Sequence, residues 1–258
     1  MADASGGRDR SETLVVVPTY NEIGSLEAIV GRIRNAVPDA DILVVDDGSP
    51  DGTGHLGDRL AATDVRVRVL HRTQKNGLGQ AYLAGFAAAL DGSYRYVVEI
   101  DADGSHDPAS LPAMIALAQD GADLVIGSRW VDGGAVKNWP WHRRAISRAG
   151  NWYARRALRS GIRDITAGFR VYRLDALRDL DLSSVSSQGY CFQVELAWLI
   201  ERSGHRIAEH PITFVERVTG RSKMHAGIVV EALMRITLWG LTAAVKPRRR
   251  SSLGLGEP

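Results

Sequence analysis

The sequence has little cysteine, no long uncharged hydrophobic run and little net charge, and each shortage limits what the protein can be. Its 258 residues include one cysteine, Cys191, so no disulfide can form within the chain. This fits a reducing compartment, and the apolar neighbours of Cys191 predict a packed core residue. No run of ~18 apolar residues is free of charge, which argues against a spanning helix. The best candidate, residues 228–245, contains Glu231 and Arg235.

The net charge is +2, a balance that gives no indication of a nucleic-acid partner. Arginines nevertheless gather in two places, Arg143, Arg144, Arg148, Arg155, Arg156 and Arg159, and again Arg248, Arg249 and Arg250. The ordinary interpretation of such clusters is a solvated helix face, and the alternative is contact with phosphates or an anionic membrane. Residues 1–12 are polar and Gly-rich without the apolar core of a secretion signal, and we expect a disordered lead-in there.

Apolar runs and helical periodicities alternate along the first half of the chain. The expected strands are residues 14–17, 41–45, 65–70, 94–100 and 124–126, and the expected helices 26–37, 51–60, 78–90 and 111–118. Such alternation predicts an α/β fold, with a mostly parallel central sheet and helices on both faces. After Gly127 the pattern becomes irregular and basic, which indicates a functional subregion and not a separate domain.

Acidic residues follow three of the expected strands, at the edge where parallel sheets bind ligands. Asp101 and Asp103 are two residues apart, and in an extended segment both side chains point to one side. A divalent cation relieves the repulsion of two carboxylates, and Mg²⁺ completes its shell with substrate phosphates and water. A lone Asp-X-Asp also occurs in solvated turns, but the position after a buried strand favours a metal–diphosphate site.

The neighbouring pair Asp46 and Asp47 ends another buried strand. Adjacent side chains tend to point in opposite directions, so one carboxylate can enter a pocket while the other braces a turn. The residues that follow, 48–53, are typical of turns.

These motifs resemble a known family. The runs VPTYNE at 17–22, VDDGSPDGT at 45–53 and DAD at 101–103 are similar to those of family 2 inverting glycosyltransferases of the GT-A fold. Further runs at 76–82, 127–130, 144–148, 164–170 and 214–217 narrow the resemblance to dolichol-phosphate and polyprenol-phosphate mannose synthases, over residues 13–240.

The resemblance implies GDP-mannose as donor, a polyprenyl phosphate as acceptor, and Mg²⁺ or Mn²⁺ as cofactor. It places Pro18, Tyr20, Glu22, Val45 and Asp47 at the guanosine, Asp101, Ala102 and Asp103 at the metal and diphosphate, Arg129, Arg143 and Ser147 at the acceptor phosphate, and Arg221 and Lys223 over the donor diphosphate. Asp101, Asp103 and Arg129 are the expected catalytic residues. Some relatives have glutamine where Ser105 stands, so a metal role for Ser105 is open.

The chemistry needs no strong base. A phosphate monoester has a second pKa of ~6 and is already anionic at neutral pH. The difficulty is bringing two anions together and stabilising the leaving diphosphate, which a metal and bidentate arginines can do. His106, beside the aspartate pair, is expected to be a loop residue, and Trp130, Trp139 and Trp141 flank a basic loop where their rings could contact lipid.

The expected organisation is a catalytic domain over 13–226, an interfacial helix over 227–245 and a basic flexible tail over 246–258. A helix packed on the domain is an equal alternative for 227–245. We expect a peripheral protein on the cytoplasmic face of a membrane, with a membrane-protein partner.

Three alternatives to this function stay open. One is glucose transfer from UDP-glucose, and another is a non-catalytic nucleotide-binding module. The third, an oxidoreductase, is disfavoured because the glycines at 77 and 79 lack the third glycine of a dinucleotide motif.

Overall fold

The computed structural model describes residues 11–185, 187, 190–216 and 226–245. The lead-in residues 1–10, the loop carrying Arg221 and Lys223, and the tail 246–258 lie outside the described residues. Ser11 and Glu12, which we expected in the disordered lead-in, are ordered. The carbonyl of Glu12 accepts from the backbone N–H groups of Arg95 and Tyr96 at 2.8 and 2.9 Å.

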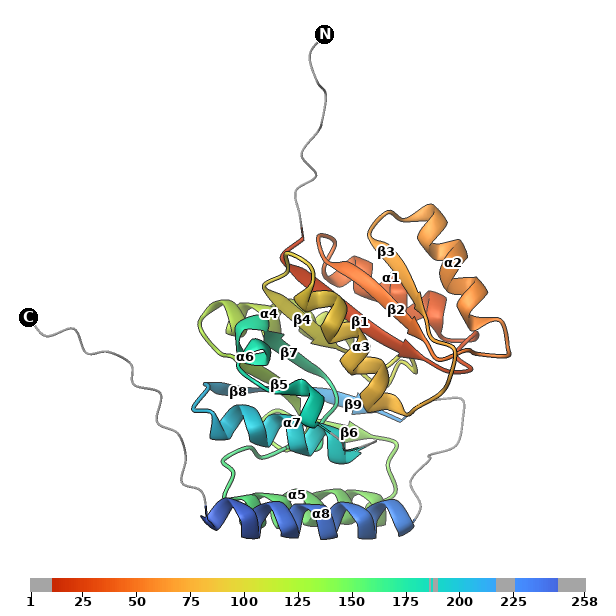
Figure 1. Cartoon of the computed structure of the whole chain (residues 1–258). Coiled ribbons are helices and arrows are strands. Elements are labelled where there is room, and N and C mark those ends of the chain that lie inside the picture. Colours follow the sequence, from red (N-terminus) through yellow and green to blue (C-terminus); the bar gives the residue numbers. More distant parts are fainter. Residues whose placement is uncertain (1–10, 186, 188–189, 217–225, 246–258) are drawn as a thin grey trace, which may run out of the picture.

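A seven-stranded sheet forms the centre of the molecule (Figure 1). In spatial order its strands are β3 (Val67–His71), β2 (Asp41–Asp46), β1 (Thr13–Thr19), β4 (Tyr96–Glu99), β7 (Arg170–Arg173), β5 (Leu124–Ser128) and β8 (Ile207–Pro211). Only β7 runs antiparallel to its neighbours in this sheet. The expectation of a mostly parallel sheet is therefore confirmed. A second, two-stranded sheet pairs β6 (Ala135–Lys137) with β9 (Thr213–Val215).

Helices cover both faces of the large sheet. They are α1 (Leu26–Ala36), α2 (Thr53–Thr63), α3 (Leu78–Leu90), α4 (Leu111–Gln119), α5 (Trp141–Leu158), α6 (Leu174–Arg178), α7 (Tyr190–Arg202) and α8 (Ala226–Val245), with short 3₁₀ turns at Pro108–Ser110 and Leu182–Ser184. The expected helix over 78–90 is confirmed at both ends.

Alternation along β1 explains the layers. Leu14 and Val16 belong to the core beneath α3 and α7, whereas Val15 and Val17 belong to the core beneath α1 and α4. A strand buried on both faces needs apolar residues at every position, which is why β1 reads as an unbroken apolar run.

The last helix packs against α5, and the two lie side by side below the sheet (Figure 1). Their contact is close, because a Cβ added to Gly240 would lie 2.4 Å from the carbonyl oxygen of Ala157. Ile236 is buried and Trp239 stacks on Trp198, with ring centroids 5.9 Å apart. Among the described residues, no helix has both the length and the apolar character needed to cross a membrane.

Candidate functional site

The carboxyl ends of β2, β1 and β4 meet at one edge, because these strands are neighbours and run parallel. Pro18 pairs in register with the buried Val45, so the first two expected guanosine segments lie side by side. The edge therefore brings together the polar segments that the sequence places after each of these strands.

Asp46 braces the turn after β2, as one member of the aspartate pair was expected to do. It accepts from the hydroxyl of Thr19 at 3.0 Å and from the backbone N–H of Ser49 at 3.0 Å. Asp47 instead pairs with Arg72. Burial raises the pKa of Asp47, and the neighbouring Arg72 guanidinium opposes that rise. Arg72 was missed because it follows a strand that ends without an acidic residue.

The loops after β1 and β2 are joined by hydrogen bonds that hold Tyr20 and Glu22. The backbone N–H of Glu22 donates to the hydroxyl of Thr53 at 2.9 Å, and that of Asn21 donates to Ser49 at 3.0 Å. The Tyr20 ring carries the Lys75 ammonium 3.6 Å from its centroid. The backbone that carries Tyr20 and Glu22, both expected at the guanosine, is thus held against the loop after β2.

Asp101 and Asp103 lie in a turn after β4, so the extended geometry that we expected for them is wrong. The strand ends at Glu99, and residues 102 and 103 form a turn. Asp101 accepts from the Tyr82 hydroxyl at 3.0 Å, and Asp103 accepts from the backbone N–H of Ser105 at 3.0 Å. Both carboxylates are partly exposed at the sheet edge, and a turn also keeps them near one another.

His106 is in a loop as expected, but it is buried. Its ring stacks on Phe169 with centroids 5.2 Å apart and meets Phe214 edge-on at 5.3 Å. Burial lowers the pKa of His106 to about 4, against the opposing effect of Asp103. The imidazole therefore serves as a neutral support, with its Nδ1 4.0 Å from Asp101.

The oxygen atoms at this edge suit a hard divalent cation. Asp101 and Asp103 offer carboxylates, and the buried hydroxyl of Ser105 has no hydrogen-bond partner among the described residues. Mg²⁺ and similar ions bind through one or two carboxylates and take further oxygens from substrate phosphates. Within the described ranges, no group of three or more His, Cys, Asp or Glu side chains is arranged to hold a metal.

Glu99 lies fully buried two residues before Asp101 and was not anticipated. Burial raises the pKa of Glu99 to about 8, and Arg170 acts in the opposite direction. The Arg170 guanidinium is itself buried and donates to the carbonyls of Ala167, Ile165 and Gln193, each at 2.8 Å. Glu99 and Arg170, which pair across β4 and β7, thus form a buried polar cluster next to the sheet edge.

Arg129 is buried and paired with Asp164. Its guanidinium donates to both carboxylate oxygens at 2.7 Å, and its backbone N–H donates to the same group at 2.8 Å. A bidentate pair of this kind fixes the planar guanidinium in one orientation. Asp164 belongs to the 164–170 run that carried the family resemblance, but no role had been assigned to it.

Arg143 and Ser147 reach the same region from α5. The Arg143 guanidinium pairs with Glu216 and lies 4.3 Å from the centroid of the Trp139 ring, while Arg129 lies 5.5 Å from that ring. Trp139 is buried, so it packs in the domain and cannot make the lipid contact that was open for it, whereas Trp141 is 80% exposed. The structure thus gathers the expected acceptor arginines around one indole.

Comparisons with known proteins extend these observations. The profile of Glycosyl transferase family 2 matches residues 14–181. The chain is 52% identical over 240 residues to the polyprenol monophosphomannose synthase of Mycolicibacterium smegmatis, covering 93% of this chain and 91% of the relative. It is 55% identical over 230 residues to the undecaprenyl-phosphate mannosyltransferase of Micrococcus luteus, covering 89% and 94%.

A solved structure shows the same fold. The mannosyltransferase of Pyrobaculum calidifontis in complex with GDP-Man and Mn²⁺ aligns with a TM-score of 0.57 and 18% identity. The alignment covers 92% of this chain, which spans 64% of that structure's length.

Proposed function

The chain belongs to glycosyl transferase family 2, and we propose that it transfers mannose from GDP-mannose to a polyprenyl phosphate, giving polyprenyl-phosphate β-mannose and GDP. The observation that carries this proposal is a pair of carboxylates at the nucleotide edge, with arginines gathered around Trp139 beyond them. The high identity to two polyprenyl-phosphate mannosyltransferases supports both the sugar and the acceptor.

In this mechanism an oxygen of the acceptor phosphate attacks C1 of mannose as the bond from C1 to the GDP oxygen breaks. The configuration inverts from α to β, and no proton has to be removed because the acceptor is already anionic. Asp101 and Asp103 would hold Mg²⁺ or Mn²⁺, which supplies positive charge for the departing diphosphate. Ser105 offers a further hydroxyl beside them.

The donor nucleoside would lie on the segments after β1 and β2. Pro18, Tyr20, Glu22, Val45 and Asp47 are the residues that we assign to the guanosine, and Ala102 lies between the metal ligands. Asp47 has Arg72 as a partner, which stabilises its charged form at the nucleotide edge. The assignment of Arg221 and Lys223 to the donor diphosphate stays a prediction.

The acceptor phosphate would lie near Arg129, Arg143 and Ser147. Asp164 holds the Arg129 guanidinium in a fixed plane, so the arginine is oriented before an anion arrives. Ser147 lies one turn after Arg143 on α5, and its carbonyl accepts from Asn151 at 3.0 Å. Helix α5 therefore supplies two of the three acceptor groups on one rigid element.

The layer formed by α5 and α8 supports the proposal of peripheral membrane association. Its exposed large apolar side chains are Leu233, Met234, Leu238 and Leu241 on α8, and Trp141, Ile146 and Trp152 on α5. The inner side of α8 packs on the domain while its outer side exposes leucines, which supports an interfacial role for that outer side. A membrane-protein partner and the cytoplasmic face stay predictions.

A donor and acceptor assay tests the proposal. The protein is incubated with polyprenyl phosphate and either labelled GDP-mannose or labelled UDP-glucose, and lipid-linked sugar is extracted. We expect label from GDP-mannose only. Label from UDP-glucose alone would establish the glucose alternative, and label from neither donor would leave a nucleotide-binding module.

A further inference from the structure

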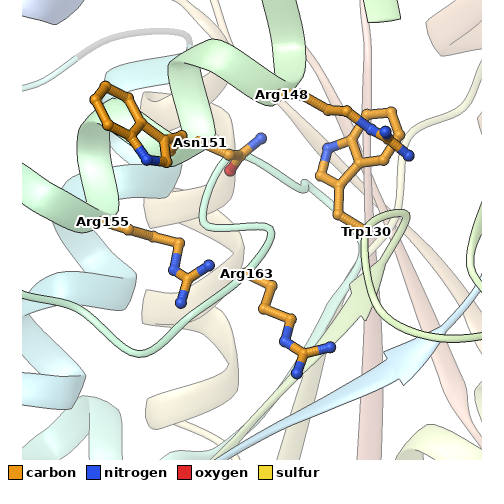
Figure 2. Close-up of a pocket in the computed structure, with 6 residues that line it drawn as sticks. Trp130, Arg148, Asn151, Arg155 and Arg163 are labelled. Carbon is orange, nitrogen blue, oxygen red and sulfur yellow. The ribbon is translucent and has the colours of Figure 1, made fainter. Parts of the chain in front are cut away.

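A hollow on the flank of α5 is lined by three arginines and two tryptophans. Its volume is about 210 Å³, and its walls are formed by Trp130, Arg148, Asn151, Trp152, Arg155 and Arg163. No carboxylate lines it, and neither do Arg129 and Arg143. Figure 2 shows Trp130, three arginine side chains and Asn151 around this space. The hollow is thus lined by other residues than those assigned to the acceptor phosphate, but it adjoins them, since Asn151 donates to the Ser147 carbonyl at 3.0 Å and the Arg129 guanidinium lies 5.9 Å from the Trp130 ring centroid.

Helical spacing explains how the walls come together. Arg148, Asn151, Trp152 and Arg155 lie at positions i, i+3, i+4 and i+7 of α5, so they share one face. Trp130 comes from the segment after β5, and Arg163 from the segment after α5. Because the fold brings three separate segments to one place, the hollow is a built feature of the protein.

The positive charge in this hollow is not balanced by the part of the chain that the structure describes. Arg148, Arg155 and Arg163 make no ion pair with a described carboxylate. The Arg148 guanidinium is held 4.8 Å from the Trp130 ring centroid. The carboxylate of Glu209 accepts from the backbone N–H of Arg163 at 2.8 Å, which anchors the loop. Three exposed guanidiniums around one hollow attract an anion that enters it.

A buried donor points to the same kind of ligand. The indole Nε1 of Trp130 is buried and has no acceptor among the described residues. Asn151 cannot serve, since its amide nitrogen donates to the Ser147 carbonyl and to Thr166, and its oxygen accepts from the Thr166 backbone. A group with several acceptor oxygens and a negative charge satisfies both the indole and the guanidiniums.

We propose that this hollow, the pocket on the flank of α5, binds the phosphate of an anionic membrane lipid headgroup. Trp152, on the wall of the pocket, is 65% exposed, and the same helix exposes Trp141 and Ile146. Indole rings favour the headgroup level of a membrane, where phosphates are found. The inference rests on the proposed membrane-surface function, and it adds a lipid site that is not the acceptor site.

Vesicle binding by the full-length protein tests the proposal. Binding is measured by sedimentation with phosphatidylcholine vesicles, alone or mixed with phosphatidylglycerol, for the wild type and for R155Q/R163Q. The matched control R59Q/R156Q loses the same charge from exposed positions outside the pocket, one of them on α5. We expect the pocket variant to lose about thirtyfold in affinity for the anionic vesicles, and the control about fivefold or less.

Three results would overturn the proposal. Equal losses in the two variants would show diffuse charge attraction. Binding of inorganic phosphate that R155Q/R163Q abolishes, with vesicle binding unchanged, would make the ligand a free anion. Reduced mannose transfer by R155Q/R163Q to a detergent-dispersed acceptor would show that the hollow is part of the acceptor site. Vesicle binding is measured without donor, so it does not depend on sugar transfer. A wild type that transfers no mannose would therefore refute the proposed function without changing the vesicle-binding result.

Discussion

Two regions of the molecule fix their functional groups in different ways. The nucleotide edge is formed by the ends of β1, β2 and β4, with Asp46, Asp101 and Asp103, and the arginine region consists of Arg129 and Arg143 around Trp139. At the nucleotide edge, carboxylates accept from nearby backbone N–H groups and hydroxyls, as Asp46 and Asp103 do. Around Trp139, the two expected acceptor arginines each have a carboxylate partner distant in sequence, Asp164 for Arg129 and Glu216 for Arg143. A local turn thus holds Asp103 and the Tyr82 hydroxyl holds Asp101, whereas ion pairs between distant segments orient the expected acceptor arginines.

The largest effect should come from the nucleotide edge. Asp101→Asn keeps an acceptor for the Tyr82 hydroxyl but removes a charge from the metal site. We expect transfer to fall by about a thousandfold or more while the unfolding temperature stays close to that of the wild type. Asp103→Ala should behave in the same way.

The control for these variants is Asp107→Asn, in the same loop, where the exposed carboxylate pairs with Arg32. Its transfer rate should match the wild type. Full turnover by Asp101→Asn would remove the metal site from the mechanism.

Breaking the buried pair in the arginine region should mainly affect stability. Asp164→Ala leaves the Arg129 guanidinium buried without its carboxylate, at a cost of about 3–5 kcal/mol in the free energy of unfolding. Asp175→Ala removes an exposed partner of Arg178 and should cost under about 1 kcal/mol. Denaturant unfolding measures both, and equal costs would contradict the distinction between a buried and an exposed ion pair.

A smaller effect should appear where α8 meets α5. Gly240→Ala places a methyl group against the Ala157 carbonyl, so the helices must shift, at a cost of about 1–3 kcal/mol. Gly150→Ala on α5 meets no atom within 4 Å and should be neutral or stabilising by up to about 1 kcal/mol. Thermal unfolding of the two variants compares them directly, and destabilisation by both would refute a specific contact.

A further effect concerns the pH dependence of stability and His106, which packs between the two regions. Its pKa is lowered to about 4 in the folded state, so below its ordinary value of 6.5 the unfolded chain binds a proton that the folded chain does not. Stability due to this group is therefore present above pH 6.5 and is lost as the pH falls toward 4. His106→Gln should flatten that part of the stability profile, and an unchanged profile would show that another group is responsible.

Local sequence patterns predicted much of the nucleotide-binding half. Apolar runs located β1 and β2, and an Ala-rich segment located α3, because these signals lie within the elements themselves. The strand β7 could not be found in this way, since its four residues begin and end with arginine. Burial of Arg170 depends on the carbonyls of Ala167 and Ile165 in the preceding loop and of Gln193 on α7, and no periodic pattern reveals these contacts.

The residue types of the site were predicted better than their partners. The strand ends indicated the aspartates, but the buried state of His106 depends on packing against Phe169 and Phe214, which come from distant segments. Asp164 and Glu216 were overlooked for the same reason, because ion pairs across 35 and 73 residues leave no periodic signal.

The central claim is that a divalent cation on Asp101 and Asp103 is needed for sugar transfer. The most direct measurement is transfer of labelled mannose from GDP-mannose to polyprenyl phosphate in Mn²⁺, in EDTA, and after Mn²⁺ is restored. We predict lipid-linked product with the metal, none in EDTA, and recovery on restoration. Undiminished product in EDTA would contradict the account.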